Sequence, residues 1–266
     1  MRSLLERHVT AADRFILVAP PGREVPPNFH NVRGDASQHH AYVRELQRFR
    51  GEIYLRDGAI RSLPSDGRHE TPEDYRSWHV LRLDEQGRIS ACIWYLEHDG
   101  PMSIDRLRVS DCPLNEHIDW RQHLHGAVAS EFGRASAEGL PYAEVGGWAV
   151  ASDRRCSVEG ILLALSAFSL GRIFGGAMVM ATATARHASA SILRRLGGSL
   201  LECEGKALPA YFDPRYDCEM ELLRFDTRRA SSRYDHLVQV LTDSLSRVSV
   251  VTSSMVSEKS EASVAA

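Results

Sequence analysis

The sequence predicts an α/β (α+β) fold in which helices flank a mixed sheet. Residues 143–198 read as strand, turn, helix, strand and helix, and the first of these helices is apolar on nearly every side, which indicates burial against a sheet. Residues 78–84 and 88–97 are β-rich runs joined by the turn sequence DEQG, which predicts a hairpin. Residues 37–53 and 115–137 carry apolar side chains at helical spacing. We expect these segments to form one main domain.

The composition excludes several classes of protein. The 266 residues are 43% hydrophobic with a formal net charge of -3, so the basic excess typical of nucleic-acid binding is missing. There is no apolar run of about eighteen residues, so we expect no transmembrane segment and a cytoplasmic protein. The five cysteines are scattered and never form CxxC, which argues against a disulfide framework and a zinc knuckle. We expect reduced cysteines and no metal.

The chain divides into four stretches by composition. Residues 1–36 form a poorly defined lead-in, with a possible strand at 14–19 and then PPGREVPP, which continues neither a helix nor a central strand. Residues 37–228 form the main domain. Residues 229–250 hold a C-terminal amphipathic helix, and residues 251–266 lack the apolar content to order themselves, so we expect a disordered tail.

The first half of the main domain begins with an amphipathic helix. Ser37 is its expected N-cap, because a hydroxyl there accepts from the first free N–H groups. Residues 55–75 follow as a long polar loop, and loops of this length are usually functional lids or disordered; we expect this one to face the substrate. After the hairpin we expect a weak strand at 104–109 and the helix at 115–137.

The second half starts with a strand at 142–150. Its pair Gly146-Gly147 indicates a bulge or a close approach by another backbone or a ligand. A helix at 157–174, a strand at 177–184 and a short helix ending at Gly197-Gly198 come next. Residues 199–204 and 218–225 read as strands that close the sheet, and a helix is expected at 232–248.

The turn before the buried helix has the residues of a phosphate site. The first turn of a helix leaves N–H groups unpaired and carries partial positive charge. Arg154, Arg155 and the N–H groups of residues 156–160 are therefore a candidate pyrophosphate site, in which Gly160 lets the backbone come close. The alternative is an ordinary crossover with two solvated arginines.

The order of elements resembles the GNAT acyltransferase superfamily, whose mostly antiparallel mixed sheet is splayed open to admit the pantetheine arm of a thioester. Residues 42–227 look most like the autoinducer-synthase branch, which comprises acyl-homoserine-lactone synthases and N-acyl amino acid synthases. In that branch an Arg is followed four residues later by Phe or Tyr, as are Arg50 and Tyr54. Asp74 matches the second Asp of an acidic D-x-x-D, and Glu144 matches the Glu that opens the bulged strand.

Four positions depart from the pattern of that branch. Thr71 replaces the first acidic residue, Trp94 replaces an Arg on the second hairpin strand, and Gly147 replaces the Arg three positions after the strand Glu. Val158 takes the place of the middle glycine of the phosphate turn. These departures put an S-adenosylmethionine-derived homoserine lactone product in doubt, while the fold assignment stands.

The resemblance implies roles for individual residues. Glu144 is the candidate base for the attacking amine. Asp74 and Arg50 either bind the charged ends of the acceptor or pair with each other. His187 is a candidate proton donor to the leaving thiolate, or a solvent-facing helix residue. The expected donor-binding residues are Trp148, Val150, Arg154, Arg155, Cys156, Ser157, Val158, Glu159 and Gly160. Cys156 is either a small residue of the turn or an acylated nucleophile.

The expected activity is that of a GNAT-type N-acyltransferase. It would move a medium or long acyl group from acyl carrier protein or coenzyme A to an amine such as an amino acid, with the acyl thioester as co-substrate and no tightly bound cofactor. A short-chain N-acetyltransferase is one alternative. A non-catalytic GNAT-like module that binds an acyl thioester or a partner is another, favoured by the degenerate phosphate turn and the missing arginines.

Overall fold

One large sheet dominates the computed structural model, which describes residues 14–100, 102–155 and 157–254 and, for residue 187, the backbone alone. Its strands are β1 (Phe15–Val18), β2 (Val32–Gly34), β3 (Trp78–Leu83), β4 (Ile89–His98), β5 (Tyr142–Val150), β6 (Met178–Thr184), β7 (Ser199–Leu200), β10 (Tyr211–Asp213), β11 (Cys218–Asp226) and β12 (Ser249–Thr252). Their order is β10-β11-β6-β5-β4-β3-β1-β12-β2, with β7 beside β11. In the described residues, only the pairs β5–β6, β1–β12 and β12–β2 are parallel. The predicted mixed, mostly antiparallel sheet is confirmed.

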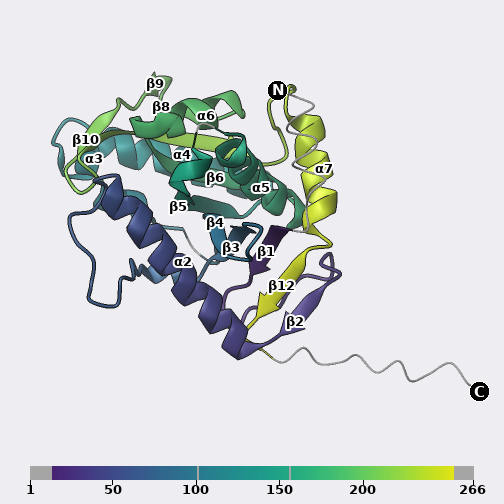
Figure 1. Cartoon of the computed structure of the whole chain (residues 1–266). Coiled ribbons are helices and arrows are strands. Elements are labelled where there is room, and N and C mark those ends of the chain that lie inside the picture. Colours follow the sequence, from purple (N-terminus) through teal and green to yellow (C-terminus); the bar gives the residue numbers. More distant parts are fainter. Residues whose placement is uncertain (1–13, 101, 156, 255–266) are drawn as a thin grey trace, which may run out of the picture.

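Helices cover both faces of the sheet (Figure 1). Alternate residues of a strand point to opposite faces. Ala143 of β5 therefore packs with α5 (Glu159–Ile173) and α7 (Asp235–Leu245), whereas Tyr142 packs with α4 (Arg121–Ala137). The face that carries α4 also carries α2 (Ala36–Arg56), and the α5 face also carries α6 (Ser189–Arg195).

Helix α2 begins two residues earlier than predicted. The N-cap is Asp35 rather than Ser37, and its carboxylate accepts a hydrogen bond of 2.9 Å from the backbone N–H of Gln38. Val43, Leu46 and Ile53 then recur at helical spacing and are buried against the sheet. The C-terminal end of this helix consequently reaches the site described below.

Helix α5 is buried on nearly every side, as its sequence predicts. Leu162, Leu163 and Leu165 are fully buried because the sheet lies on one side of the helix and α7 on another. The hydroxyls of Ser166 and Ser169 donate to carbonyls one turn earlier, so these polar groups are satisfied inside the core. Burial of this helix fixes the turn that precedes it.

The weak strand predicted at residues 104–109 is wrong. This segment forms two single turns, η3 (Ile104–Arg106) and η4 (Arg108–Asp111). The turns bury Leu107 and Val109 against the α4 side of the sheet, and local bonds such as Leu107 N–H to Ile104 carbonyl (2.9 Å) satisfy the backbone. The apolar residues were read as strand alternation, but the same spacing suits a turn of helix.

The two ends of the described chain join the sheet. β1 and β2 come from the segment predicted to be a poorly defined lead-in, and β12 lies parallel between them. Residues 251 and 252 belong to β12, whereas the rest of the predicted tail from residue 255 lies outside the described residues. Residues 202–207, between β7 and β10, form the small ribbon of β8 (Glu202–Cys203) and β9 (Lys206–Ala207).

Candidate functional site

The sheet opens beside β5. The register between β4 and β5 shifts by one residue between the pairs Cys92–Ala149 and Trp94–Gly146, which places a β-bulge at Gly147 and Trp148. The parallel pairing of β5 with β6 stops at Val145 and Ala181, although both strands continue. A gap between two strands thus begins next to the bulge, as the resemblance implies.

The glycine pair makes room for an indole ring. A Cβ on Gly147 would lie 2.2 Å from Trp94 Cδ1, and a Cβ on Gly146 would lie 2.5 Å from Trp94 Cζ2. Gly147 also has φ of 63°, a conformation that other residues adopt at a cost. Trp94 therefore lies flat on the bulge and is itself buried.

We expect Gly147→Ala to lower the free energy of unfolding by about 2–4 kcal/mol, because it adds both backbone strain and a clash with Trp94. Gly87→Ala is the matched control, since Gly87 has φ of 78° and nothing within 4 Å of its added Cβ. It should cost only about 1 kcal/mol. Urea unfolding curves measure both values, and equal losses would contradict the close contact with Trp94.

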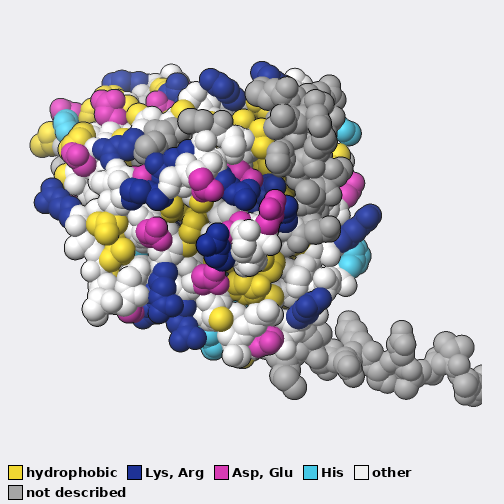
Figure 2. Space-filling view, in the orientation of Figure 1, with side chains coloured by type: hydrophobic (Ala, Val, Ile, Leu, Met, Phe, Trp, Pro, Cys, Tyr) yellow, Lys and Arg dark blue, Asp and Glu magenta, His cyan; other side chains and the backbone are white. Residues whose placement is uncertain are grey.

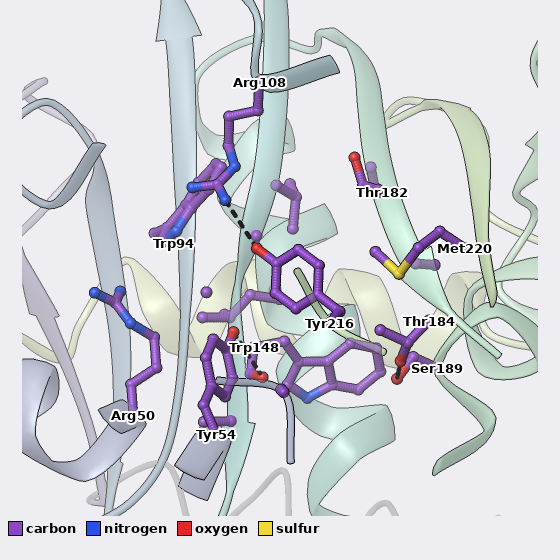
Figure 3. Close-up of a pocket in the computed structure, with 18 of the residues that line it drawn as sticks. Arg50, Tyr54, Trp94, Arg108, Trp148, Thr182, Thr184, Ser189, Tyr216 and Met220 are labelled. Carbon is purple, nitrogen blue, oxygen red and sulfur yellow. Dashed lines mark hydrogen bonds between the residues drawn. The ribbon is translucent and has the colours of Figure 1, made fainter. Parts of the chain in front are cut away.

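A cavity of about 980 Å³ passes through the gap. Its walls come from α2, the loop after α2, η4, β5, β6 and the turn before α5. Figure 3 shows Trp94, Arg108 and Tyr216 pointing toward one another in one part of the cavity, with Tyr54 and Trp148 beside them. Thr182, Thr184, Ser189 and Met220 line another part. The volume is at the upper end of the range for ligand pockets.

Glu144 lies in this cavity wall, one residue before the strands part. Its side chain is about 5% exposed. One carboxylate oxygen accepts from the backbone N–H of Arg108 at 3.0 Å, and the other lies 2.9 Å from His98 Nε2. These two bonds fix the carboxylate next to the gap, the place where a base for an attacking amine would be needed.

Arg50 and Asp74 form an ion pair with each other, which is one of the two alternatives that the resemblance left open for them. The guanidinium holds both carboxylate oxygens at 2.7 Å, and both side chains are fully buried. Gln47 and the backbone N–H of Thr71 also donate to Asp74. Burial alone would raise the pKa of Asp74, but Arg50 overrides it and the pKa is lowered. The pair ties α2 to η2 (Pro72–Tyr75) beneath the cavity.

His79 extends this buried network and makes stability depend on pH. Its Nε2–H donates to the Asp74 carbonyl at 2.8 Å, and burial lowers its pKa from 6.5 to about 4. The unfolded chain therefore takes up a proton near pH 6.5 that the folded chain takes up only near pH 4.

We expect protonation of His79 to lower the free energy of unfolding by about 3 kcal/mol as pH drops from 6.5 to 4. In His79→Gln, which keeps an N–H donor, that part of the fall should vanish. Urea unfolding at a series of pH values measures it, and identical pH profiles for the two proteins would refute the assignment to His79.

Arg108 lies over the ring of Trp94, with its Cζ 5.7 Å from the ring centroid. Its guanidinium donates to Glu73 at 2.9 Å and to the hydroxyl of Tyr216 at 3.2 Å. The side chain is about one-third exposed. The sequence pattern did not single out Arg108, Glu73 or Tyr216, because they come from three loops that meet only in the folded chain.

Tyr54, which the resemblance matched together with Arg50, lies near the bulge. Its hydroxyl is 3.4 Å from the carbonyl oxygen of Trp148, to which it donates. Burial raises the pKa of Tyr54, so the hydroxyl keeps its proton at neutral pH. The contact holds the C-terminal end of α2 against β5.

The predicted phosphate turn is only partly directed into the cavity. Val150, Arg154, Arg155, Ser157 and Gly160 line it together with Trp148. Val158 instead packs against the core, and Glu159 is buried between Arg82 at 3.0 Å and Arg154 at 3.4 Å. A Cβ on Gly160 would lie 3.3 Å from the ring of Trp148, so this indole covers the first turn of α5.

An acidic residue from α2 meets the basic residues of this turn. Asp57, the C-cap of α2, accepts from Arg155 at 2.6 Å through its carboxylate and from Arg186 at 2.6 Å through its carbonyl. Arg186 lies on η6 (Arg186–Ala188) and was not predicted. No sequence signal joins residues 57, 155 and 186, which are brought together only by the fold.

Two predicted residues lie outside what the structure describes. Cys156 is one of them, and the side chain of His187 is the other. The described residues contain no group of three or more His, Cys, Asp or Glu side chains arranged to hold a metal ion. Of the helices described, none has the length and apolar character to cross a membrane. Figure 2 shows basic and acidic side chains intermingled over the visible face.

No protein-family model matches the sequence, and no curated protein matches it either. Solved structures do match. The structure of a CoA-dependent acyl-homoserine lactone synthase, BjaI, with SAM and isopentyl-CoA has a TM-score of 0.53 at 15% identity, over 90% of this chain and 92% of that chain. A second CoA-dependent acyl-homoserine lactone synthase, MesI, has a TM-score of 0.51 at 14% identity, over 90% and 98%.

FeeM, an N-acyl amino acid synthase from uncultured soil microbes, has a TM-score of 0.47 at 13% identity, over 71% of this chain and 92% of that chain. The likeness to BjaI and MesI spans nearly the whole of each chain. This protein therefore has the GNAT-like fold of the acyl-homoserine lactone synthases, which it resembles.

Proposed function

We propose that this protein is an N-acyltransferase that moves an acyl group from a coenzyme A or acyl carrier protein thioester to an amine such as an amino acid. The observation that carries the proposal is the continuous cavity of about 980 Å³, which joins the basic turn before α5, the gap between β5 and β6, and Glu144. The fold shared with two CoA-dependent synthases supports it.

The proposed chemistry uses three features of this cavity. The phosphates of the donor meet Arg154, Arg155 and Arg186 at the mouth, and its pantetheine arm enters the gap. The amine nitrogen attacks the thioester carbonyl, Glu144 takes the amine proton, and the carbon–sulfur bond breaks to release the thiolate. Alignment of the two reactants in one cavity supplies much of the rate.

The size of the cavity favours a medium or long acyl chain over acetyl. Beyond the gap, the apolar part of the wall on the α4 side includes Leu107, Cys112, Met180, Tyr211 and Met220. An acetyl group would leave most of this surface in contact with water, whereas a longer chain would bury it.

The direct test is release of free thiol by the purified full chain. Acetyl-, octanoyl- and palmitoyl-coenzyme A, and the same acyl groups on acyl carrier protein, are each incubated with the standard amino acids and simple amines. We expect amine-dependent thiol release, fastest with octanoyl or palmitoyl donors, together with the N-acyl product by mass spectrometry. Absence of thiol release with every donor and amine would overturn the proposal.

A non-catalytic binding module is the second candidate, and the ion pairs at the mouth favour it. Asp57 forms an ion pair with Arg155, and Glu159 forms one with Arg154. A phosphate must therefore compete with these two carboxylates for the arginines. Calorimetry with octanoyl-coenzyme A distinguishes the candidates when combined with the thiol assay. Binding of the thioester without release of thiol would support the module.

A further inference from the structure

Arg108 lines the cavity and keeps part of its charged side chain accessible there. Arg50 also lines the cavity, but its side chain is 1% exposed and it already holds both oxygens of Asp74. Arg108 is about one-third exposed and lies across the face of Trp94, as Figure 3 shows. Its forked N–H groups are suited to bind a carboxylate in a bidentate manner.

Its main partner is a carboxylate that also lines the cavity. Glu73 lies on η2, and one of its oxygens is 2.9 Å from a terminal nitrogen of Arg108. The Glu73 side chain is 16% exposed. A cation and an anion side by side on a cavity wall match the two charges of a zwitterion, in which an ammonium and a carboxylate are also held close together.

We propose that Arg108 and Glu73 select an acceptor that carries both an amine and a carboxylate, that is, a free amino acid. Arg108 binds the carboxylate and Glu73 binds the ammonium, which loses one proton to solvent before its nitrogen attacks and a second proton to Glu144 as the amide forms. This inference rests on the proposed acyltransferase function. Neither Arg108 nor Glu73 belongs to the family pattern that the sequence resembles.

The Arg108–Glu73 ion pair gives a reason for the site to prefer an amino acid to a simple amine. A zwitterion that enters between Arg108 and Glu73 replaces their mutual ion pair with two new ones, so neither partly buried charge loses its partner. An amine without a carboxylate would separate Glu73 from Arg108 and leave the guanidinium with the ring of Trp94 and the hydroxyl of Tyr216, neither of which carries a negative charge. A site built for a polar group rejects a ligand that lacks it.

The position of Arg108 also connects this site to the proposed base. Its backbone N–H donates to Glu144 at 3.0 Å, and its side chain rests on Trp94, which lies on the bulge at Gly146 and Gly147. Partial burial alone would lower the pKa of Arg108, but interactions with Tyr216 and Glu73 raise it, so the guanidinium stays charged. A carboxylate bound there holds the amine near the gap.

The test compares matched acceptors on matched variants. The best amino acid from the thiol assay is compared with its carboxamide and its decarboxylated amine, on the wild type, Arg108→Gln, Arg108→Lys, Glu73→Gln and the control Arg88→Gln. Arg88 is 73% exposed on the turn between β3 and β4. Calorimetry measures binding of the same three acceptors without a donor, and thermal unfolding confirms that each variant is folded.

We expect the wild type to prefer the amino acid to its carboxamide by about 10- to 100-fold in kcat/KM. Arg108→Gln should abolish this preference by raising KM for the amino acid while KM for the thioester is unchanged, and Arg108→Lys should restore part of it. Arg88→Gln should behave as the wild type does. A preference that persists in Arg108→Gln, or a wild type that prefers the carboxamide or the decarboxylated amine, overturns the inference.

These outcomes separate the inference from the proposed function. Thiol release that is equally fast with all three acceptors would support the acyltransferase function and refute the amino-acid site. Carboxylate-dependent binding that is lost in Arg108→Gln, without thiol release from any donor, keeps the site and removes the acyltransferase. If neither carboxylate-dependent binding nor thiol release is observed, both the amino-acid site and the acyltransferase function are refuted.

Discussion

Glu144→Gln is expected to lower kcat for amine acylation by about 10²- to 10⁴-fold, the usual contribution of a general base. In the wild type, a carboxylate oxygen of Glu144 accepts a hydrogen bond of 3.0 Å from the backbone N–H of Arg108. The amide oxygen of glutamine can accept the same bond, so the wall of the cavity should stay in place. It cannot take a proton from the attacking amine. The thiol assay at saturating donor and acceptor measures kcat directly.

Glu131→Gln is the matched control for this variant. Glu131 is also a buried glutamate, but it lies on α4 and is engaged by Arg134 and Arg224. Its replacement should lower stability and leave kcat within about twofold of the wild type. If Glu144→Gln turned over as fast as Glu131→Gln, Glu144 would be no more than a support for Arg108.

The sequence predicted those parts of the fold in which local pattern and burial agree. The strand at 142–150 and the buried helix after it were recognisable because a glycine pair in a β-rich run and a helix apolar on all sides each have one simple explanation. β12 was missed because it is a short strand, SVVT, which begins soon after α7 ends at Leu245 and resembles a continuation of that helix.

The same reasoning explains what could be predicted of the site. Glu144 was singled out because the resemblance expects a Glu at the start of the bulged strand, and the structure places its side chain in the cavity wall. Asp57 and Arg186 were not found, since each lies at the end of an element and acquires its partner from elsewhere in the chain. Polar contacts of this kind leave no periodic signal.

The surroundings of Trp94 could not be predicted from the sequence pattern. Trp94 stands where the resemblance led us to expect an arginine, which suggested a lost charge. The structure places the guanidinium of Arg108 over the ring of Trp94. A positive charge thus stands in this region, supplied by a loop rather than by the strand, and only tertiary structure reveals it.

Asp74→Ala is expected to lower the free energy of unfolding by about 3–5 kcal/mol, because it leaves the buried guanidinium of Arg50 without its counter-charge. Arg50 is only 1% exposed, so water solvates its guanidinium poorly when that carboxylate is removed. The double variant Asp74→Leu with Arg50→Met should recover much of the stability, since apolar side chains of similar volume replace both charges. Urea unfolding followed by tryptophan fluorescence measures all three proteins.

Asp213→Ala is the comparison that isolates the cause. Asp213 is as buried as Asp74, but its partner Arg215 is 51% exposed and is solvated when the carboxylate is removed. Its loss should cost about 1–2 kcal/mol, the value of hydrogen bonds alone. The difference between the two variants therefore reports the cost of an uncompensated buried charge. Equal costs would mean that Arg50 reaches water or another anion in the variant, and that the pair does not hold α2 against η2 beneath the cavity.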